Sequence, residues 1–244
     1  MYKGKSVSVV MSTYNEKESI RKCIEDFLNT GFVDEVIIVN NNATEGTDEE
    51  VSKTRARIVY ESKQGYGYGF QLGLAEAKGD LLVMCEPDGT FYPSDIEKYL
   101  VYSQDMMVVQ GSRTNATTIL ENANMGLFLK YGNFAVAKLA ELLYMKSAPN
   151  ISDCGCTFRL IRREAYNMIR PYFREGGSAF GFELSLLTIR AGIRMCEIPI
   201  HYGERVGNSS VTGSVWKSFA LGMRMILFVM KRRILDLFVK YPVQ

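Results

Sequence analysis

Two carboxylates at the end of a short apolar run are the residues of this chain best suited to chemistry. Residues 81–85 read LLVMC, which has the size and composition of a buried parallel strand. Glu86 and Asp88 follow directly, and a glycine turn comes after them. Alternate residues of an extended segment point the same way, so both carboxylates can converge on one hard divalent cation. The pattern favours a metal clamp for a diphosphate; the alternative is an acidic turn after a strand.

Polar residues also follow the first two expected strands. Thr13, Tyr14 and Glu16 come after the first strand, and Asn40 and Asn41 come after the second. Ligands bind at the carboxyl ends of parallel strands in an open sheet. Hydroxyl and amide groups at that edge would suit the base and ribose of a nucleotide. The alternative is turn and helix-cap chemistry, which Asn and Thr serve equally well.

A glycine-rich segment opens the third expected helix. Residues 65–69 read GYGYG, with Gly67 at the centre. Glycine allows a ligand to approach the backbone closely, and a helix N-terminus favours anions. The spacing differs from the GxGxxG dinucleotide fingerprint, and the segment follows the third strand instead of the first. A dinucleotide site is therefore disfavoured.

These groups need a scaffold, and the first ninety residues alternate between strand and helix patterns. Strands are expected at residues 6–11, 35–39, 57–60 and 80–85, with helices at 15–29, 47–54 and 69–77. In the second half, strands are expected at 106–111 and 195–202, with helices at 127–143, from about 163, and at 182–191. This alternation predicts an α/β fold with a doubly wound, mostly parallel sheet.

Composition excludes several classes of function. The 244 residues carry a formal net charge of +2, which argues against a nucleic-acid partner. His201 is the only histidine, so Ser-His-Asp chemistry and multi-histidine metal sites are disfavoured. The cysteines are odd in number and form no CxxC pair, and the N-terminus shows no apolar signal segment. A cytoplasmic protein is expected.

The C-terminal stretch combines apolar and basic residues. Residues 215–241 include Trp216 and Phe219 together with Arg224, and only six uninterrupted apolar residues follow that arginine. Such a run is too short to span a bilayer but is typical of an amphipathic helix at a membrane interface. The alternatives are a helix packed on the rest of the protein and a dimer contact. We therefore divide the chain into residues 1–212, a catalytic domain, and 213–244, an amphipathic basic appendage.

Six segments in order make the chain resemble the inverting family 2 glycosyltransferases with the A-type fold. The resemblance is nearest to dolichyl-phosphate mannose synthases and related polyprenyl-phosphate sugar transferases. The matching segments are STYNE (12–16), NNNATEGT (40–47), EPD (86–88), GSR (111–113), DCGCTFR (153–159) and RVGNS (205–209). The chain departs from the family pattern at Asn40 and Asn41, where carboxylates are usual, and at Glu86, where Asp is usual.

The resemblance implies a donor site for a UDP- or GDP-linked sugar. It implies that Mg²⁺ or Mn²⁺ is held by Asp88 and Glu86, on either side of Pro87, and stabilises the leaving diphosphate. Arg113 and Arg205 would contact phosphate oxygens. The residues implied in donor binding are Thr13, Tyr14, Glu16, Asn40, Asn41, Gly67, Glu86, Pro87 and Asp88.

The acceptor implied by the resemblance decides whether a general base is needed. A polyprenyl phosphate is already an oxyanion and needs none, and Lys130 or Arg159 would hold it. A sugar hydroxyl needs a carboxylate to take its proton, and Glu183 and Asp153 are the candidates. We expect a polyprenyl phosphate acceptor and a protein peripheral to the cytoplasmic face of a membrane. The alternatives are transfer to a saccharide in glycan or capsule assembly and, in a different class, a sugar-phosphate nucleotidyltransferase.

Overall fold

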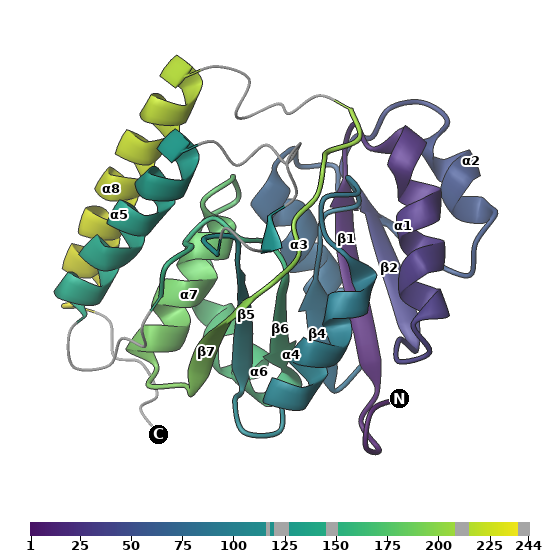
Figure 1. Cartoon of the computed structure of the whole chain (residues 1–244), viewed down its shortest axis with the longest axis horizontal. Helices are drawn as coiled ribbons and strands as arrows, with labels where there is room; N and C mark the ends of the chain where they lie inside the picture. The colour runs from purple at the N-terminus through teal and green to yellow at the C-terminus, as the bar shows by residue number, and fades with distance from the viewer. Residues whose placement is uncertain (116–117, 120–126, 145–150, 208–214, 239–244) are drawn as a thin grey trace.

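A seven-stranded sheet forms the centre of the computed structural model, which describes residues 1–115, 118–119, 127–144, 151–207 and 215–238. The strands are β1 (Val7–Thr13), β2 (Glu35–Asn40), β3 (Arg57–Tyr60), β4 (Leu81–Met84), β5 (Val108–Ser112), β6 (Arg159–Arg162) and β7 (Met195–Pro199). Their order across the sheet is β3-β2-β1-β4-β6-β5-β7. Only β6 runs antiparallel to its neighbours among these strands. The predicted doubly wound, mostly parallel sheet is confirmed (Figure 1).

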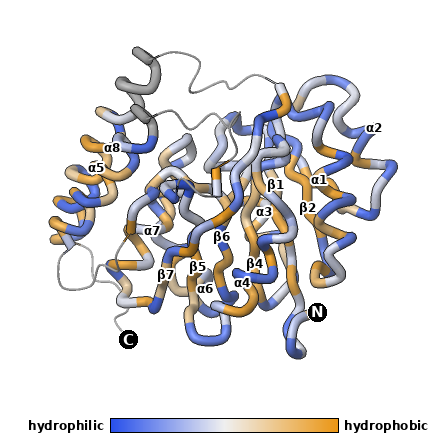
Figure 2. Tube along the Cα trace, viewed as in Figure 1, coloured by the Kyte–Doolittle hydropathy of each residue, from blue (hydrophilic) through white to orange (hydrophobic). Residues whose placement is uncertain are grey.

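Helices cover both faces of this sheet. They are α1 (Lys17–Asn29), α2 (Thr47–Ser52), α3 (Tyr66–Glu76), α4 (Ile96–Tyr102), α5 (Leu127–Leu143), α6 (Arg163–Ile169), α7 (Phe180–Arg190) and α8 (Val215–Leu235), with 3-10 turns at Pro93–Asp95 and Arg170–Tyr172. Alternate residues of β1 face opposite layers, so Val9 and Met11 pack with α1 and α4 while Val10 packs with α3. The apolar strands lie at the centre of the molecule (Figure 2).

Strand β6 is the main element that the sequence pattern did not predict. It has four residues, Arg159–Arg162, and it is inserted between β4 and β5. An arginine stands at each end of the strand, so its sequence lacks the continuous apolar run that marks β4. Pairing with two buried strands holds this segment in place, which is a tertiary effect.

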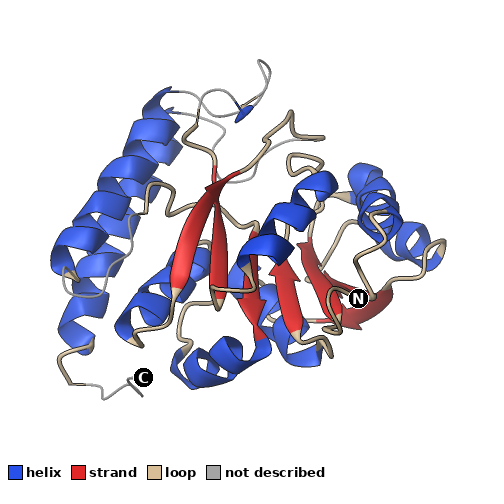
Figure 3. Ribbon diagram, turned by 60° about the horizontal axis from the view of Figure 1, so that its bottom comes forward, coloured by secondary structure: helices blue, strands red, loops and turns tan. Residues whose placement is uncertain are grey.

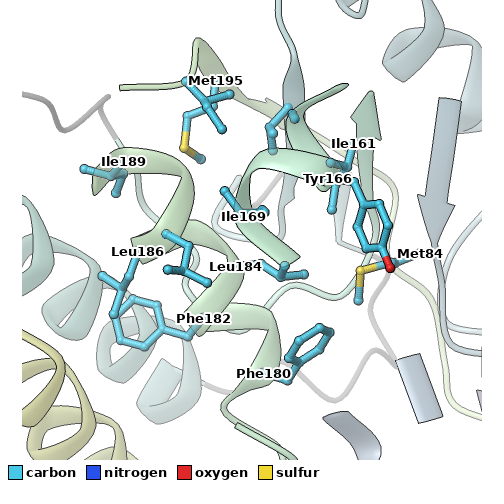
Figure 4. Packing of buried hydrophobic residues seen from close by; sticks show 14 of the residues in the cluster. Met84, Ile161, Tyr166, Ile169, Phe180, Phe182, Leu184, Leu186, Ile189 and Met195 are labelled. Atoms are coloured by element: carbon cyan, nitrogen blue, oxygen red, sulfur yellow. The ribbon is translucent and has the colours of Figure 1, made fainter. Parts of the chain in front are cut away.

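Helices α5 and α8 lie side by side at one end of the sheet, outside α7 (Figures 1 and 3). Helix α7 is buried along nearly its whole length, as expected for a helix between two layers. Figure 4 shows Phe180 facing Met84 and Phe182 on the opposite side of the helix. The Phe182 ring lies 6.2 Å from that of Phe228 in α8, so the inner side of α8 joins the core.

The outer side of this helix pair is apolar and exposed. We call it the outer α5–α8 face; its exposed apolar residues are Tyr131, Phe134, Leu142, Met223, Leu227, Met230 and Ile234. No helix in the described part of the chain is long and apolar enough to cross a membrane. The proposed boundary between residues 212 and 213 lies outside the described residues, and the division into two units stays a prediction.

Candidate active site

Asp88 lies at the carboxyl edge of the sheet, just beyond β4. Gly89 takes a φ of 82°, a left-handed value that glycine adopts without strain, and so turns the chain directly after the acid. The Asp88 side chain is buried, and its Oδ1 accepts hydrogen bonds from the Thr90 N–H (3.0 Å) and hydroxyl (2.6 Å). Its Oδ2 lies 2.8 Å from Arg205 Nη1 but accepts no hydrogen bond of good geometry. One oxygen is thus fixed by hydrogen bonds, and the other is engaged only by the charge of Arg205.

Glu86 lies beside Asp88 and is held by a hydroxyl. Its Oε1 accepts a hydrogen bond of 2.6 Å from Thr157, and 28% of its side chain remains exposed. Loss of water around the carboxylate, followed by the nearby charge of Asp88, raises the pKa of Glu86 to about 7. Between the two acids, the Pro87 carbonyl accepts a hydrogen bond of 2.6 Å from Ser19 of α1, which anchors the turn.

A segment from the far end of the chain crosses this turn and carries Arg205. The Gly203 N–H donates to the Thr90 carbonyl (2.8 Å), and the Val206 N–H donates to the Asp88 carbonyl (2.9 Å). Backbone hydrogen bonds on either side of Arg205 therefore fix where its side chain starts. The last two residues of the RVGNS segment, 208 and 209, lie outside the described residues.

Glu16 joins the loop after β1 to Arg205. Its Oε2 accepts hydrogen bonds from the N–H groups of Tyr14 (2.8 Å) and Asn15 (2.9 Å) and from the Thr13 hydroxyl (3.2 Å). Its Oε1 accepts a hydrogen bond of 3.1 Å from Arg205 Nη2. Glu16 and Thr13 are therefore committed to the shape of this loop, whereas the Tyr14 side chain is 46% exposed. Tyr14 remains a candidate for donor contact.

The acids around Arg205 fit a divalent cation. Glu16, Glu86 and Asp88 all direct an oxygen toward this one guanidinium, with Glu86 Oε2 at 3.8 Å from Nη1. Hard cations such as Mg²⁺ and Mn²⁺ prefer oxygen ligands, and buried Asp88 Oδ2 accepts no hydrogen bond. In the described part of the chain, no group of three metal-ligating side chains is arranged to hold an ion by itself. A metal held by Asp88 and Glu86 would take its other ligands from a diphosphate and water.

Asn41 is buried and saturated by contacts within the protein. Its Nδ2 donates to the carbonyls of Glu61 (2.8 Å) and Lys63 (2.9 Å), and its Oδ1 accepts a hydrogen bond of 2.8 Å from the Gly65 N–H. These bonds hold the loop between β3 and α3. The geometry therefore gives Asn41 a structural task, and its contact with a donor stays a prediction.

Asn40 faces a polar pair that the sequence pattern did not single out. Its Nδ2 donates to Asp48 Oδ1 (2.7 Å), and its Oδ1 accepts a hydrogen bond from the Ala43 N–H (2.8 Å). The Tyr60 hydroxyl donates to the other Asp48 oxygen (3.0 Å) and its ring is exposed. Asp48 thus supplies a carboxylate near Asn40. It lies eight residues further along the chain, which is why the strand-end pattern missed it.

Gly67 makes a close approach to backbone within the protein. A Cβ at this position would lie 2.5 Å from the Glu175 carbonyl oxygen. The N–H groups of Gly67 and Tyr68 donate to the Gly176 carbonyl at 2.9 and 3.2 Å. The first turn of α3 is therefore packed against the 175–176 backbone. Two of its N–H groups already have an acceptor, and a diphosphate contact at Gly67 stays a prediction.

Arg113 and Asp153 form a buried ion pair. Arg113 Nε and Nη2 donate to the two carboxylate oxygens of Asp153 at 2.8 and 2.9 Å, and the Arg113 N–H donates to Oδ2 at 2.9 Å. Burial alone would raise the pKa of Asp153, but the Arg113 charge and the hydrogen bonds from Arg113 and Gly155 lower it below its usual 3.8. The carboxylate is therefore stabilised as an anion and has no free oxygen with which to take a proton.

Glu183 is fully buried at the start of α7. It accepts hydrogen bonds from the N–H groups of Arg174 (3.1 Å) and Glu175 (2.9 Å), and its Oε1 pairs with Arg232 of α8 at 2.8 Å. Burial raises its pKa, and the hydrogen bonds and the Arg232 charge oppose that shift. Glu183 therefore connects α7, the 174–175 loop and α8. Its role as a general base stays a prediction that this geometry does not favour.

The two residues expected to hold an acceptor phosphate are in different environments. Arg159 is buried, and its guanidinium donates to the carbonyls of Gly181 and Cys156. Burial lowers its pKa, as expected for a cation removed from water. Lys130 lies in the first described turn of α5 and is partly exposed. Lys130 is therefore the better placed of the two to meet a ligand.

Thr157 and Tyr66 are contributors that the sequence pattern did not reveal. The Tyr66 hydroxyl lies 2.6 Å from the Thr157 hydroxyl, which in turn donates to Glu86. The signal available was the position of Thr157 inside the DCGCTFR segment, two residues before Arg159. Tyr66 lies in the glycine-rich segment, whose pattern predicts ligand contacts through the glycine backbone and not through a tyrosine side chain.

Comparison with known proteins yields one family model and several relatives. Residues 8–170 match the family described as glycosyl transferase family 2. The low-salt glycan biosynthesis hexosyltransferase Agl6 of Haloferax volcanii is 26% identical over 92% of this chain and 53% of its own length. The dolichyl-phosphate hexose transferase of the same organism is 28% identical over 86% of this chain and 88% of its own. The chain thus spans about half of the first relative and most of the second.

A solved structure supports the fold. Glucosyl-3-phosphoglycerate synthase from Mycobacterium tuberculosis, in complex with Mn²⁺, uridine diphosphate and glucosyl-3-phosphoglycerate, superimposes with a TM-score of 0.72. The match covers 94% of this chain and 80% of that chain at 17% identity. At this identity the likeness shows a shared fold. The A-type architecture expected from the motifs is confirmed.

Proposed function

The chain belongs to glycosyl transferase family 2, and from that premise we propose that it transfers a hexose from a nucleoside diphosphate sugar to a polyprenyl phosphate. The family match covers residues 8–170, which include Asp88 and the acids around it. The Haloferax volcanii relative at 28% identity is named as a dolichyl-phosphate hexose transferase, which supports this acceptor class.

The donor would bind at the carboxyl edge of the sheet. Asp88 and Glu86 would hold Mg²⁺ or Mn²⁺, which when bound supplies Lewis-acid stabilisation of the leaving diphosphate. Buried Asp88 Oδ2 is the ligand atom that best supports this assignment, because it accepts no hydrogen bond and is balanced only by the ion pair with Arg205, a cation where a metal ion would also bind. Arg205 would donate to diphosphate oxygens. The Mn²⁺ and uridine diphosphate bound by the Mycobacterium tuberculosis enzyme support the same class of donor.

The choice of acceptor rests on the two carboxylates that would otherwise act as a base. Asp153 is bound by Arg113 through both oxygens, and Glu183 is buried against Arg232. A carboxylate must reach the proton that it abstracts, and neither side chain is free to do so. A phosphate acceptor is already an oxyanion, so its attack on the sugar needs no proton transfer. This observation favours a lipid phosphate over a sugar hydroxyl.

The outer α5–α8 face would bring the enzyme to the lipid acceptor. It presents exposed Leu227, Met230 and Ile234 together with exposed Arg224 and Lys231. Apolar residues with basic neighbours on one helix face are typical of helices that lie at an anionic membrane surface. Both α5 and α8 begin at the edge where β1 and β4 end (Figure 1). All five cysteines are free, which supports the cytoplasmic side of the membrane.

The test is a product assay with defined donors and acceptors. UDP-sugars and GDP-mannose would be incubated with Mn²⁺ or Mg²⁺ and with undecaprenyl or dolichyl phosphate. A lipid-phosphate sugar formed by the wild type and lost in Asp88→Ala would support the proposal. Product on a saccharide alone would replace it with the glycan-assembly alternative. Release of pyrophosphate from a nucleoside triphosphate and a sugar 1-phosphate would replace it with a nucleotidyltransferase.

A further inference from the structure

Arg205 binds the same oxygen that a metal ion would need. Its Nη1 lies 2.8 Å from Asp88 Oδ2 and 3.8 Å from Glu86 Oε2, and its Nη2 lies 3.1 Å from Glu16 Oε1. Asp88 Oδ1 is already engaged by the Thr90 N–H and hydroxyl. Oδ2 is therefore the oxygen of this acid that remains for a cation, and the guanidinium lies against it.

A metal ion and Arg205 compete for the same carboxylate oxygen. An ion such as Mg²⁺ binds a carboxylate oxygen at about 2.1 Å. With Nη1 held 2.8 Å from the same oxygen, the two cations would be close together and would repel strongly in this partly buried site. The guanidinium therefore weakens metal binding at Asp88 for as long as it stays beside Oδ2.

The Arg205 side chain can move away from Oδ2 and relieve this repulsion while its backbone stays in place. The Gly203 and Val206 N–H groups anchor the segment to Thr90 and Asp88, so the Arg205 backbone has little freedom. The side chain is long and 23% exposed, which leaves it a path toward solvent. Glu16 Oε1 would keep one end of the guanidinium at the edge of the site during the change.

We infer that Arg205 makes metal binding depend on the diphosphate of the donor. The diphosphate gives the displaced guanidinium new oxygen partners and gives the ion further ligands, so the two bind together more tightly than either binds alone. Glu16 acts as the positioning residue that keeps Arg205 within reach. The inference rests on the proposed function, because it assumes a metal at Asp88 and a nucleoside diphosphate. Coupling of this kind is reciprocal, so Mn²⁺ would also tighten nucleotide binding.

The experiment measures metal binding without turnover. Free and bound Mn²⁺ would be quantified by electron paramagnetic resonance in the full chain, with and without UDP or GDP. We expect weak Mn²⁺ binding by the wild type alone and much tighter binding with nucleotide. In Arg205→Gln, Mn²⁺ alone should bind about tenfold tighter or more than in the wild type, because a nearby positive charge is gone. The gain from adding nucleotide should shrink in the same variant.

Two further variants separate the local effect from general charge. Arg205→Lys keeps a cation at the site and should stay close to the wild type. Arg57→Gln removes one positive charge at a surface pair with Glu35 and Glu76 and should leave Mn²⁺ affinity unchanged. Thermal melts would show that each variant is folded.

Failure of the inference about Arg205 and failure of the proposed function would give different results. If the wild type binds Mn²⁺ with nucleotide but Arg205→Gln binds Mn²⁺ alone no more tightly than the wild type, the inference is overturned and the proposed function stands. If neither protein binds Mn²⁺ with UDP or GDP, the proposed metal use falls and the inference falls with it.

Discussion

Four carboxylates of this protein have different surroundings, and we expect them to have different roles for that reason. Asp88 keeps one buried oxygen without a hydrogen bond, whereas Asp153 has both of its oxygens bound by Arg113. Glu86 keeps part of its surface exposed, whereas Glu183 is buried against Arg232. We propose that the first acid of each pair binds a ligand, and the second connects elements of the structure. Surroundings, and not residue type, separate these roles.

Substitution of Asp88 tests the available oxygen. Asp88→Asn should lower formation of lipid-phosphate sugar by about 100-fold or more, because an amide is a poor ligand for a hard cation that stabilises the leaving group. Removal of divalent metal with a chelator should abolish wild-type activity, and added Mn²⁺ should restore it. The comparison is the initial rate at saturating donor. Wild-type rates that persist in the chelated protein would contradict metal use.

Substitution of Glu183 tests whether this residue is a general base in catalysis or a structural carboxylate. Glu183→Gln should destabilise the protein by about 3 kcal/mol, because Arg232 loses one of its buried carboxylate partners and keeps only the longer contact with Asp236 among the ion pairs described. Its kcat with polyprenyl phosphate should stay within about tenfold of the wild type, whereas loss of a general base would lower kcat by about 10²–10⁴. Denaturant unfolding and steady-state kinetics measure the two effects.

Arg232→Gln is the matched control for that substitution. It breaks the same ion pair, together with the contacts of Arg232 to Asp236 and the Tyr172 carbonyl, and leaves Glu183 as a carboxylate. Its loss of stability should therefore be at least as large. If kcat falls strongly in Glu183→Gln but not in Arg232→Gln, Glu183 acts as a general base.

At the scale of elements, the site depends on how helices meet the ends of strands. The first turn of α3 packs against the backbone of 175–176, and the segment carrying Arg205 pairs with the turn after β4. Helix α8 contributes Met225 and Val229 to the core and leaves the opposite side exposed. These contacts join segments that are distant in the sequence.

Gly67 tests the contact at the start of α3. Gly67→Ala should lower the free energy of unfolding by about 2 kcal/mol or more, because the new Cβ would lie 2.5 Å from the Glu175 carbonyl oxygen. Gly132→Ala in α5 is the control, since a Cβ there has no atom within 4 Å. That control should be neutral or slightly stabilising, as expected for alanine in a helix. Equal destabilisation of both variants in denaturant titrations would refute the packing account.

The outer α5–α8 face can be tested with vesicles. Leu227→Glu combined with Ile234→Glu should weaken binding to vesicles that contain anionic phospholipid by about tenfold or more, since two exposed apolar side chains can no longer enter the interface. Co-sedimentation gives the bound fraction. Val101→Glu, an exposed apolar position on α4, should leave binding unchanged. Unaltered binding of the double variant would favour the alternative of a dimer contact.

At the scale of the whole molecule, buried ion pairs make global stability sensitive to acid. The pKa of Asp153 is lowered below 3.8 in the folded protein, so its contribution is fully present above that value and is lost as pH falls through the folded pKa. In this window the unfolded chain binds more protons than the folded one. Stability therefore falls with falling pH.

In Asp153→Asn, the free energy of unfolding should depend less on pH than in the wild type. The free energy of unfolding would be measured by denaturant titration at intervals from pH 6 to about pH 3. The variant should be less stable at pH 6, because Arg113 loses a buried partner, and the gap to the wild type should narrow toward acid pH. A gap that stays constant over the range would show that Asp153 does not titrate differently in the two states.

Patterns of neighbouring residues along the sequence were sufficient to predict most of the strands and helices. The apolar run of β4, the helical spacing of α5 and the turn residues between elements are set by neighbours along the chain, so the sequence alone predicted the alternation and the parallel sheet. It also predicted that Glu86 and Asp88 stand together at a strand end, because two residues of separation suffice for that. Strand β6 escaped prediction because pairing with β4 and β5 stabilises it more than its own composition does.

Only the tertiary structure decided which partner each polar group has. Arg205 reaches Glu16 across 189 positions of sequence, and Glu183 reaches Arg232 across 49. No local pattern encodes such pairings, since they follow from the order of strands and the packing of helices on them. They determine how each carboxylate is engaged: Asp88 Oδ2 has an ion pair with Arg205 but accepts no hydrogen bond, while Asp153 and Glu183 accept hydrogen bonds from their arginine partners. Sequence thus determined the kind of chemistry available, and the fold decided which groups can perform it, because burial and hydrogen bonding set the reactivity of each side chain.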